Sequence, residues 1–585
     1  MKIKSQFILV IILTLLVSTQ LFSQSDLSKI NLKYEKNITL TYNEIIDAYK
    51  ILDSNFDKAK LIEVGKTDIG KPLHLFIISG DSDFDPESVK RKNRTVVFIN
   101  NGIHPGEPCG MDASIQFAMD LLTDKNNKLA LLENLVFCIV PIYSPGGTLN
   151  RSAFNRANQD TPYEAGFRGN GRNLDLNRDF VKLDTKNARS LVKAFRTWEP
   201  QVFLDTHTTN GSDHQYVITL IAQNPASMHP AAGKYFKNKM VPDLYRRMAK
   251  GKYEMIPYIA SIGKTPYEKG FINYIPSPRF STGYTNLFNN FCFMTENHIF
   301  KEYKDRVKSV YNFITALAEY SSENSSEINS VIARVNEEIK TQKEFILNWK
   351  LDKEKFSLIN FKGYRGKYKK SMLTGLDRFY YDHNDKFEEK IKYYTEYNPS
   401  KKITAPKKYI IPQAWSEAIE RLKLNNIEFE ILEQDSIIEC EVYYITDLKS
   451  YSRPHNGHFF HTKVTTRKEI QKIQYFKGDM IVAVNQKSNR YIVNVLEPEA
   501  PDSFFRWNFF DACLDQREYF STYVFEEKAI KLLEEIPGLR EKFEVKQKSN
   551  EKFRKNQRAQ LDFIYKNSPY YEKTHKRYPV ARILH

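Results

Sequence analysis

The chain has 585 residues, of which 41% are hydrophobic and 13% aromatic, and its formal net charge is +16. This length exceeds one ordinary core and predicts two to four domains, while the composition excludes a disordered chain. The basic residues are spread along the chain without an arginine-rich arm. The charge therefore predicts a solvated surface and no nucleic-acid partner.

The first residues predict an export signal. Lys2 and Lys4 precede the short apolar run "FILVIILTLLV", and small polar residues follow it. This pattern is typical of a secretory signal peptide, here residues 1–23, and the run is too short for an obvious spanning helix. We expect an exported protein, periplasmic or secreted, with no stable membrane insertion once the signal is removed; a signal anchor is the alternative.

The five cysteines are too few for a disulfide scaffold in so long a chain, and none forms a CxxC pair. Cys138 and Cys292 lie in apolar, strand-like runs. We expect the cysteines to be buried free thiols.

From residue 41 the chain alternates helical and strand patterns. Helical spacing of apolar residues covers 41–56, 110–122 and 185–200, whereas β-branched or continuous apolar runs mark strands within 59–80, 94–102, 133–147, 201–211 and 288–298. Strands that alternate with helices predict an α/β sheet with helices on both faces.

The second half has its own helix and strand signals. Residues 301–350 look mostly helical, with a Ser/Glu/Asn break near 321–329. Strand, helix, turn and strand follow within 407–432, further strands at 440–448 and 478–486, and a helix at 526–545. We therefore predict a first domain at 24–320, a helical linker at 321–350 and a C-terminal α/β accessory domain at 351–585.

The residues with metal-binding chemistry follow predicted strands, where ligands bind in open α/β sheets. "HPGE" places His104 and Glu107 three residues apart in a tight turn, and "DTH" brings His207 to the end of another strand. Two histidines and one glutamate leave a fourth position for water, as in catalytic zinc sites. An ordinary turn remains the alternative for the pair, and His214 is a competing third ligand. Asp205 or Thr206 is expected to orient the ligands.

Two further groups complete the candidate site. Glu296 in "FMTENH" follows apolar strand residues and is a candidate general base. The loop "FRGNGRNLDLNRDF" contains arginines that grip carboxylates or stabilise an oxyanion, together with asparagine donors: Arg168, Arg172, Arg178, Asn170, Asn173 and Asn177. A polar surface loop is the alternative for this segment.

Together, "HPGE", "NLDLNRDF", "DTH" and "FMTENH", in this order over roughly residues 40–320, resemble the zinc metallocarboxypeptidase family M14. The resemblance implies a carboxypeptidase-like fold, a mixed and largely parallel sheet with helices on both faces. It implies one Zn²⁺ ion as cofactor, and a peptide with a free C-terminal carboxylate as substrate. The residues that the resemblance assigns are His104, Glu107 and His207 as zinc ligands, Glu296 as general base, and Asn177 and Arg178 as carboxylate binders.

The resemblance also implies an arginine that stabilises the oxyanion and a tyrosine that covers the substrate. We assign these to Arg168, with Arg172 and Arg156 as alternatives, and to Tyr284, with Tyr274 as the alternative. The chain departs from the family pattern at "SPGG", residues 144–147, where "NPDG" is common, and at "NRDF", where "NRNF" is commoner. These departures concern substrate preference more than metal binding.

The predicted function is therefore hydrolysis of a peptide's C-terminal residue. One alternative is a zinc amidase or deacylase acting on cell-wall peptides or acylated amino acids. Another is a non-catalytic exported binding protein on a peptidase fold. A third is a structural metal site in which His214 or His298 supplies a fourth ligand. The sequence does not predict the oligomeric state or the role of the last 230 or so residues.

Overall fold

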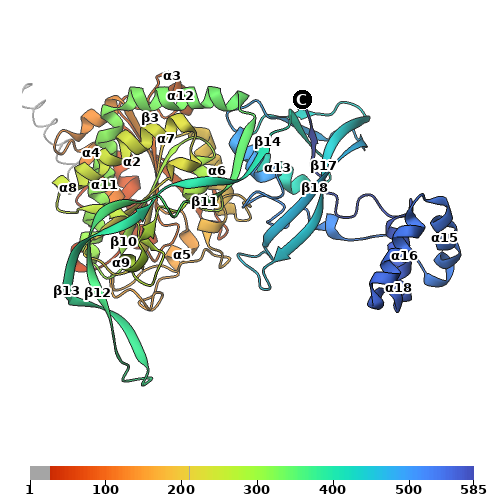
Figure 1. Ribbon diagram of the computed structural model, residues 1–585. Helices are drawn as coiled ribbons and strands as arrows, with labels where there is room; N and C mark the ends of the chain where they lie inside the picture. The colour runs from red at the N-terminus through yellow and green to blue at the C-terminus, as the bar shows by residue number, and fades with distance from the viewer. Residues whose placement is uncertain (1–26, 210) are drawn as a thin grey trace, which may run out of the picture.

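The first half of the protein is built around an eight-stranded sheet (Figure 1). The computed structural model describes residues 27–209 and 211–585; the predicted signal peptide lies outside them. The strand order is β1-β2-β4-β3-β5-β10-β6-β7. The strands are β1 (Ala59–Lys66), β2 (Pro72–Ser79), β3 (Thr95–Asn100), β4 (Leu135–Val140), β5 (Val202–Thr209), β6 (Ile218–Ala222), β7 (Met255–Pro257) and β10 (Phe291–His298).

The sheet is mixed, with a parallel centre. Strands β4, β3, β5 and β10 run parallel as neighbours, and β6 pairs in parallel with β7. The pairings β1–β2, β2–β4 and β6–β10 are antiparallel. The predicted fold class, a mixed and largely parallel sheet, is confirmed.

Helices cover both faces of this sheet, because its buried strands are apolar on both sides. In β3, Val97 and Ile99 face one core while Phe98 faces the other. The first core packs under α2 (Tyr42–Asn55), α4 (Cys109–Leu122), α8 (Val241–Lys250), α11 (Tyr303–Glu323) and α12 (Ser325–Thr341). The second packs under α6 (Lys186–Trp198) and α10 (Ser281–Asn286).

Shorter elements connect these main ones. They are η1 (Tyr34–Lys36), α3 (Pro86–Arg91), η2 (Lys128–Glu133), α5 (Pro145–Leu149), η3 (Leu176–Arg178), η4 (Pro225–Ser227), α7 (Pro230–Tyr235), η5 (Phe236–Met240), β8 (Ala260–Ser261), α9 (Pro266–Lys269) and β9 (Phe271–Ile272).

The second half adds three sheets and a helical group. A ribbon of β11 (Glu344–Leu351) and β14 (Tyr397–Thr404) leads from the first half, and the long hairpin β12 (Ser357–Lys370) and β13 (Asp377–Tyr394) joins β8 and β9. A six-stranded sheet follows, in the order β16-β19-β15-β20-β17-β18. Its strands are β15 (Lys408–Ile411), β16 (Glu430–Ile431), β17 (Ser436–Ser450), β18 (His461–Tyr475), β19 (Met480–Ala483) and β20 (Ala581–Ile583).

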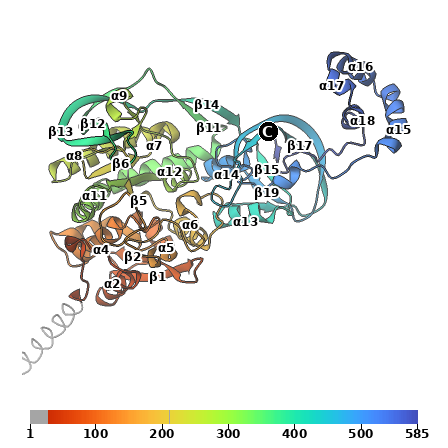
Figure 2. The ribbon, with the colours of Figure 1, turned by 90° about the horizontal axis from the view of Figure 1, so that it is seen from below.

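Helices α13 (Ser416–Leu424) and α14 (Asn489–Leu496) pack with this sheet, and η6 (Asp511–Leu514) follows them. Helices α15 (Thr522–Glu535), α16 (Leu539–Ser549), α17 (Glu551–Arg554) and α18 (Gln557–Lys566) form a separate group at the far end of the molecule (Figure 2). One expectation is wrong: the segment expected to be helical up to residue 350 turns into strand β11 from Glu344. The other domain boundaries stay predictions.

The second core does not end with the first half. The same cluster that contains Phe98 and Phe195 continues through Phe345, Tyr491 and Trp507. Buried polar contacts cross the same junction, for example the hydrogen bond from Tyr284 to Asn425. The second half therefore packs against α6 and α10, the helices that cover this face of the first sheet.

Two expectations about the whole chain can be compared with this fold. All five cysteines are free thiols, as predicted; four are buried, whereas Cys513 is partly exposed, which differs from the expectation of burial. Within the described residues, no helix has both the length and the apolarity needed to cross a bilayer.

Candidate metal centre and active site

His104, Glu107 and His207 meet at the carboxyl end of the parallel strands. Strand β3 ends at Asn100, and a loop turned by Gly102, with φ of 68°, leads into α4. The Glu107 N–H donates to the His104 carbonyl at 2.9 Å and closes the turn between them. His207 belongs to β5, the parallel neighbour of β3. The prediction that these residues gather at the ends of adjacent strands is confirmed.

The three side chains form one compact, buried group. Their potential ligand atoms all lie within 4.8 Å of one another. Nδ1 of His104 is 3.2 Å from one Glu107 carboxylate oxygen, and Nδ1 of His207 is 3.1 Å from the other. No hydrogen bond satisfies Nδ1 of His104 among the described residues. A divalent cation between the three side chains would satisfy it.

The outer nitrogen of each histidine faces an aspartate. Nε2 of His104 is 2.8 Å from Asp175 Oδ1, and Nε2 of His207 is 3.0 Å from Asp205 Oδ2. Carboxylates in this position fix the ring orientation and tautomer of zinc-binding histidines. The two histidines and one glutamate, with the aspartates that orient the histidines, therefore fit a zinc ion.

Arginines next to Glu107 keep its carboxylate charged. Arg156 Nη2 donates to Oε1 at 2.6 Å, and the backbone N–H of Thr208 donates to Oε2 at 2.9 Å. Burial alone raises the pKa of Glu107, but Arg156, His104 and His207 outweigh it and hold that pKa well below its usual value.

Glu296 lies beside the trio on β10. In the parallel pairing of β10 with β5, Glu296 is the register partner of His207, so both side chains point to the same side of the sheet. Burial raises the pKa of Glu296 to about 8; His207 opposes this shift and Glu107 adds to it. A carboxyl with such a raised pKa is suited to proton transfer near neutral pH.

These residues line a cavity of about 450 Å³. The predicted residues His104, Glu107, Arg168, Asn177, Arg178, His207 and Glu296 all line it. Arg178 stacks over the Phe280 ring, with its guanidinium carbon 4.4 Å from the ring centre. Its Nη1 donates to the Asn177 carbonyl at 2.8 Å, and Asp175 is 3.9 Å away, so its remaining donors are available to a ligand.

The three candidate arginines differ in position. Arg168 lines the cavity and donates to Asp175 Oδ2 through Nε and Nη2 at 3.2 and 3.0 Å. Arg156 lines it as well, through its contact with Glu107. Arg172 instead donates to the Asp184 carbonyl and is absent from the cavity lining. The choice of Arg168 over Arg172 agrees with this geometry.

The expectation for Tyr284 is wrong in position. Its side chain is fully buried in the second core, and its hydroxyl donates to Asn425 at 2.5 Å. A hydroxyl held there cannot cover a ligand in the cavity. Tyr274, the alternative, lines the cavity, and Glu296 is among the charges that raise its pKa.

The competing histidines lie apart from the trio. His214 and His298 pack against each other with ring centres 4.9 Å apart, and neither joins the metal-binding group found among the described residues. The alternative of a closed structural site with one of them as fourth ligand is not supported by this arrangement.

Sequence reasoning missed one residue that supports the site. Asp175 contacts both His104 and Arg168, yet "NLDLNRDF" drew attention only to its asparagines and arginines. Its position two residues before Asn177 was the available signal.

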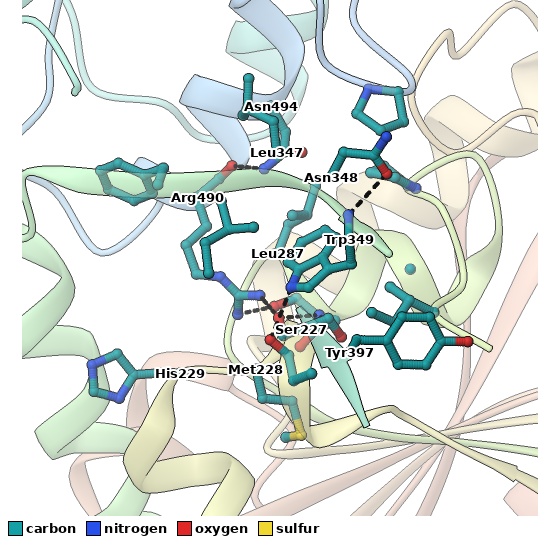
Figure 3. Close-up of a pocket in the computed structure, with 18 of the residues that line it drawn as sticks. Ser227, Met228, His229, Leu287, Leu347, Asn348, Trp349, Tyr397, Arg490 and Asn494 are labelled. Carbon is teal, nitrogen blue, oxygen red and sulfur yellow. Dashed lines mark hydrogen bonds between the residues drawn. The ribbon is translucent and has the colours of Figure 1, made fainter. Parts of the chain in front are cut away.

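A second, larger cavity of about 900 Å³ adjoins this one and shares Tyr274 and Pro276 with it. Figure 3 shows its walls, where Arg490 donates to the Ser227 carbonyl and Trp349 to the Ala226 carbonyl. The trio with metal-ligand geometry lines only the smaller cavity. The smaller cavity is therefore the candidate active site.

A sequence model of the family described as zinc carboxypeptidase matches residues 46–241, which include the trio, Arg168, Asn177 and Arg178 but end before Glu296. The chain is similar to carboxypeptidase 2 of Trichophyton rubrum, with 21% identity over 75% of this chain and 78% of the relative. A probable carboxypeptidase 2 of Arthroderma benhamiae is 28% identical over 23% of this chain and 22% of its own.

Among solved structures, the chain is similar to the carboxypeptidase A of Helicoverpa armigera, with 13% identity, a TM-score of 0.38, and coverage of 50% of this chain and 75% of that one. It is also similar to a metallo-carboxypeptidase of Pseudomonas aeruginosa in complex with (2-guanidinoethylmercapto)succinic acid. That match has 14% identity, a TM-score of 0.36, and coverage of 50% and 70%.

Proposed function

We propose that this chain is a zinc-dependent peptidase that hydrolyses the C-terminal residue from peptides, as its match to the zinc carboxypeptidase family model over residues 46–241 and its 21% identity to a carboxypeptidase suggest. The observation that carries the proposal is the buried group of His104, Glu107 and His207 in one cavity with Glu296 and Arg178. His104, Glu107 and His207 would hold the zinc ion, which would supply Lewis-acid polarisation of a carbonyl and of water.

The residues of the chain supply the proton transfers. Glu296, beside His207, takes a proton from the attacking water and passes it to the leaving amine. Arg168 donates to the oxyanion that develops on the scissile carbonyl, since its guanidinium is already held at the cavity wall by Asp175. Holding this donor in advance reduces the reorganisation that the reaction needs.

Arg178 and Asn177 recognise the C-terminal end of the peptide substrate. Arg178 binds the terminal carboxylate, because its donors face the cavity and lack a close acidic partner. The Asn177 Oδ1 accepts from the Ser281 N–H at 2.9 Å, which fixes the amide and leaves its NH₂ group for the ligand. Tyr274 takes the place of Tyr284 as the tyrosine that covers the substrate.

The proposal can be tested with pairs of peptides that differ only in a free or an amidated C-terminus. The wild-type protein should cleave the free acid and leave the amide intact. Arg178→Ala should lower kcat/KM for the free acid by about 10- to 100-fold, since a hydrogen bond to a charged group contributes about 1.5–3 kcal/mol. Arg172→Ala is the matched control.

Equal cleavage of the acid and the amide would contradict the proposal. Release of D-terminal residues alone would favour the cell-wall amidase alternative. We also propose, on the predicted leader at residues 1–23, that the protein is exported; amino-terminal sequencing of material from the cell envelope and the medium tests this.

A further inference from the structure

A hairpin of the second half reaches the catalytic loop of the first. Strands β17 and β18 are joined by the segment Tyr451–Phe460, whose tip is Asn456–Gly457. Both tip residues have positive φ, 49° and 86°, and His455 and His458 are paired through both of their N–H groups. This is the geometry of a two-residue type I′ turn, for which Asn-Gly is the preferred sequence.

The tip contacts the loop that carries the site residues. The Asn456 Oδ1 accepts from the backbone N–H of Asp175 at 3.1 Å. His458 Nε2 is 2.8 Å from Asp184 Oδ2, which anchors the tip to the far end of the same loop. The hairpin therefore contacts both ends of residues 175–184.

Asp175 links two parts of the proposed active site. One carboxylate oxygen is 2.8 Å from Nε2 of the metal ligand His104, and the other accepts from Nε and Nη2 of Arg168. The carboxylate can orient both groups only if its own backbone is fixed. In this structure the side chain of Asn456 supplies a hydrogen bond to that backbone.

We propose that Asn456 is a positioning residue of the active site, through which the second half of the chain holds Asp175, and with it His104 and Arg168, in their working orientation. The inference rests on the proposed function for its catalytic part and on the His104–Glu107–His207 group for its metal part. The β17–β18 hairpin then has a role beyond packing, because a residue of the C-terminal half supports the metal centre through Asp175.

A turn of this type requires left-handed backbone but no particular side chain. Variants that keep the turn and change only the side chain therefore distinguish the proposed positioning role of Asn456 from a purely structural one. Asn456→Gly keeps the turn and removes the acceptor oxygen. Asn456→Asp keeps both a residue that tolerates left-handed backbone and an acceptor. Asn93→Gly is the matched control, because Asn93 is exposed and also has positive φ, 55°, but lies far from the site in the loop after α3.

The test measures two quantities on the full chain: the dissociation constant for zinc, by competition with a chromogenic chelator, and kcat and KM for a peptide with a free C-terminus. Removing the hydrogen-bond partner of a metal ligand typically lowers metal affinity or activity by about 10- to 100-fold. Asn456 contacts that partner, Asp175, and not the metal ligand itself. We therefore expect Asn456→Gly to weaken zinc binding and to lower kcat by about 3- to 10-fold each, with KM nearly unchanged. Asn456→Asp should retain most of both.

Wild-type values for zinc affinity and kcat in Asn456→Gly, equal to those of Asn93→Gly, would overturn the inference. So would an equal loss in Asn456→Asp and Asn456→Gly, since the acceptor oxygen would then have no role. If the wild-type protein releases no C-terminal residues, the proposed function fails; the zinc affinities of the three variants still decide whether Asn456 positions the metal ligand.

Discussion

Two glutamates share the candidate active site in opposite electrostatic environments. Glu107 is surrounded by Arg156 and two histidines, and its pKa lies well below the usual value. Burial raises the pKa of Glu296 to about 8, with His207 and Arg168 opposing. Carboxylates whose environments move their pKa values apart perform different tasks. Glu107 is suited to hold a cation, and Glu296 to move a proton.

Replacing Glu296 separates these tasks. Glu296→Gln should lower kcat by about 10²- to 10⁴-fold, the usual contribution of a general base. The zinc content, measured by atomic absorption, should stay at the wild-type value because Glu296 is outside the trio. Glu302→Gln, at an exposed position just after β10, is the control. A variant that keeps a tenth or more of the wild-type rate would contradict this role of Glu296.

The role of a single residue was predictable where a local motif determines its position. It was not predictable where the role depends on the direction in which the side chain points. His104, Glu107 and His207 follow from strand ends and a tight turn, and these features are local. Tyr284 and Tyr274 both precede β10, but α10 turns Tyr284 into the core. Nothing in "RFSTGY" encodes that direction, because it depends on Asn425, 141 residues further along the chain.

The packing of helix α4 against α11 buries a carboxyl. The Tyr303 hydroxyl donates to Asp112 Oδ2 at 2.5 Å, and burial raises the pKa of Asp112 to about 7. In the unfolded chain this pKa returns to 3.8. Between these values the folded protein binds more protons than the unfolded chain, so stability falls as pH rises from about 4 to about 7.

Asp112→Asn should remove this dependence. Near pH 4 the variant and the wild type should unfold with similar free energies, and above pH 7 the variant should be more stable by up to about 4 kcal/mol, at about 1.4 kcal/mol per pKa unit. Urea denaturation at a series of pH values measures the difference, with Asp47→Asn, at an exposed position of α2, as control. A difference that stays constant across the pH range would refute the assignment.

Elements were most predictable where apolar residues followed a clear helical or strand pattern. The apolar strands β3, β4, β5 and β10 and helices α2, α4 and α6 occur where the sequence predicts them. Strand β11 was missed, although Phe345 and Leu347 alternate with exposed or half-buried residues at the period of a strand. The long hairpin β12–β13 has few buried residues and gave no clear pattern.

At the scale of the whole molecule, the two halves share a core but the last helices do not. The cluster around Phe98 continues to Trp507 across both halves. Helices α15–α18 have a small core of their own, centred on Phe525, Leu532 and Leu561. They are inserted before β20, which returns to pair with β15 and β17.

The helical group should therefore be removable. Its ends are close together, because the Lys576 N–H donates to the Cys513 carbonyl at 2.6 Å. Replacing residues 515–574 by a short glycine-serine linker should leave kcat/KM and the melting temperature near wild-type values. Removal of residues 351–585 should instead give an insoluble protein, since it exposes the apolar residues of the core that the two halves share. A soluble, active 24–350 fragment would contradict the shared core.

The central claim is that the trio binds zinc and that the site releases C-terminal residues. The most direct measurement is mass spectrometry of a mixed peptide pool incubated with the full mature chain, with and without a zinc chelator. The account predicts loss of single C-terminal residues, abolished by the chelator and restored by added zinc. Peptides left intact by a protein with one bound zinc ion, or cut at internal bonds, would contradict it.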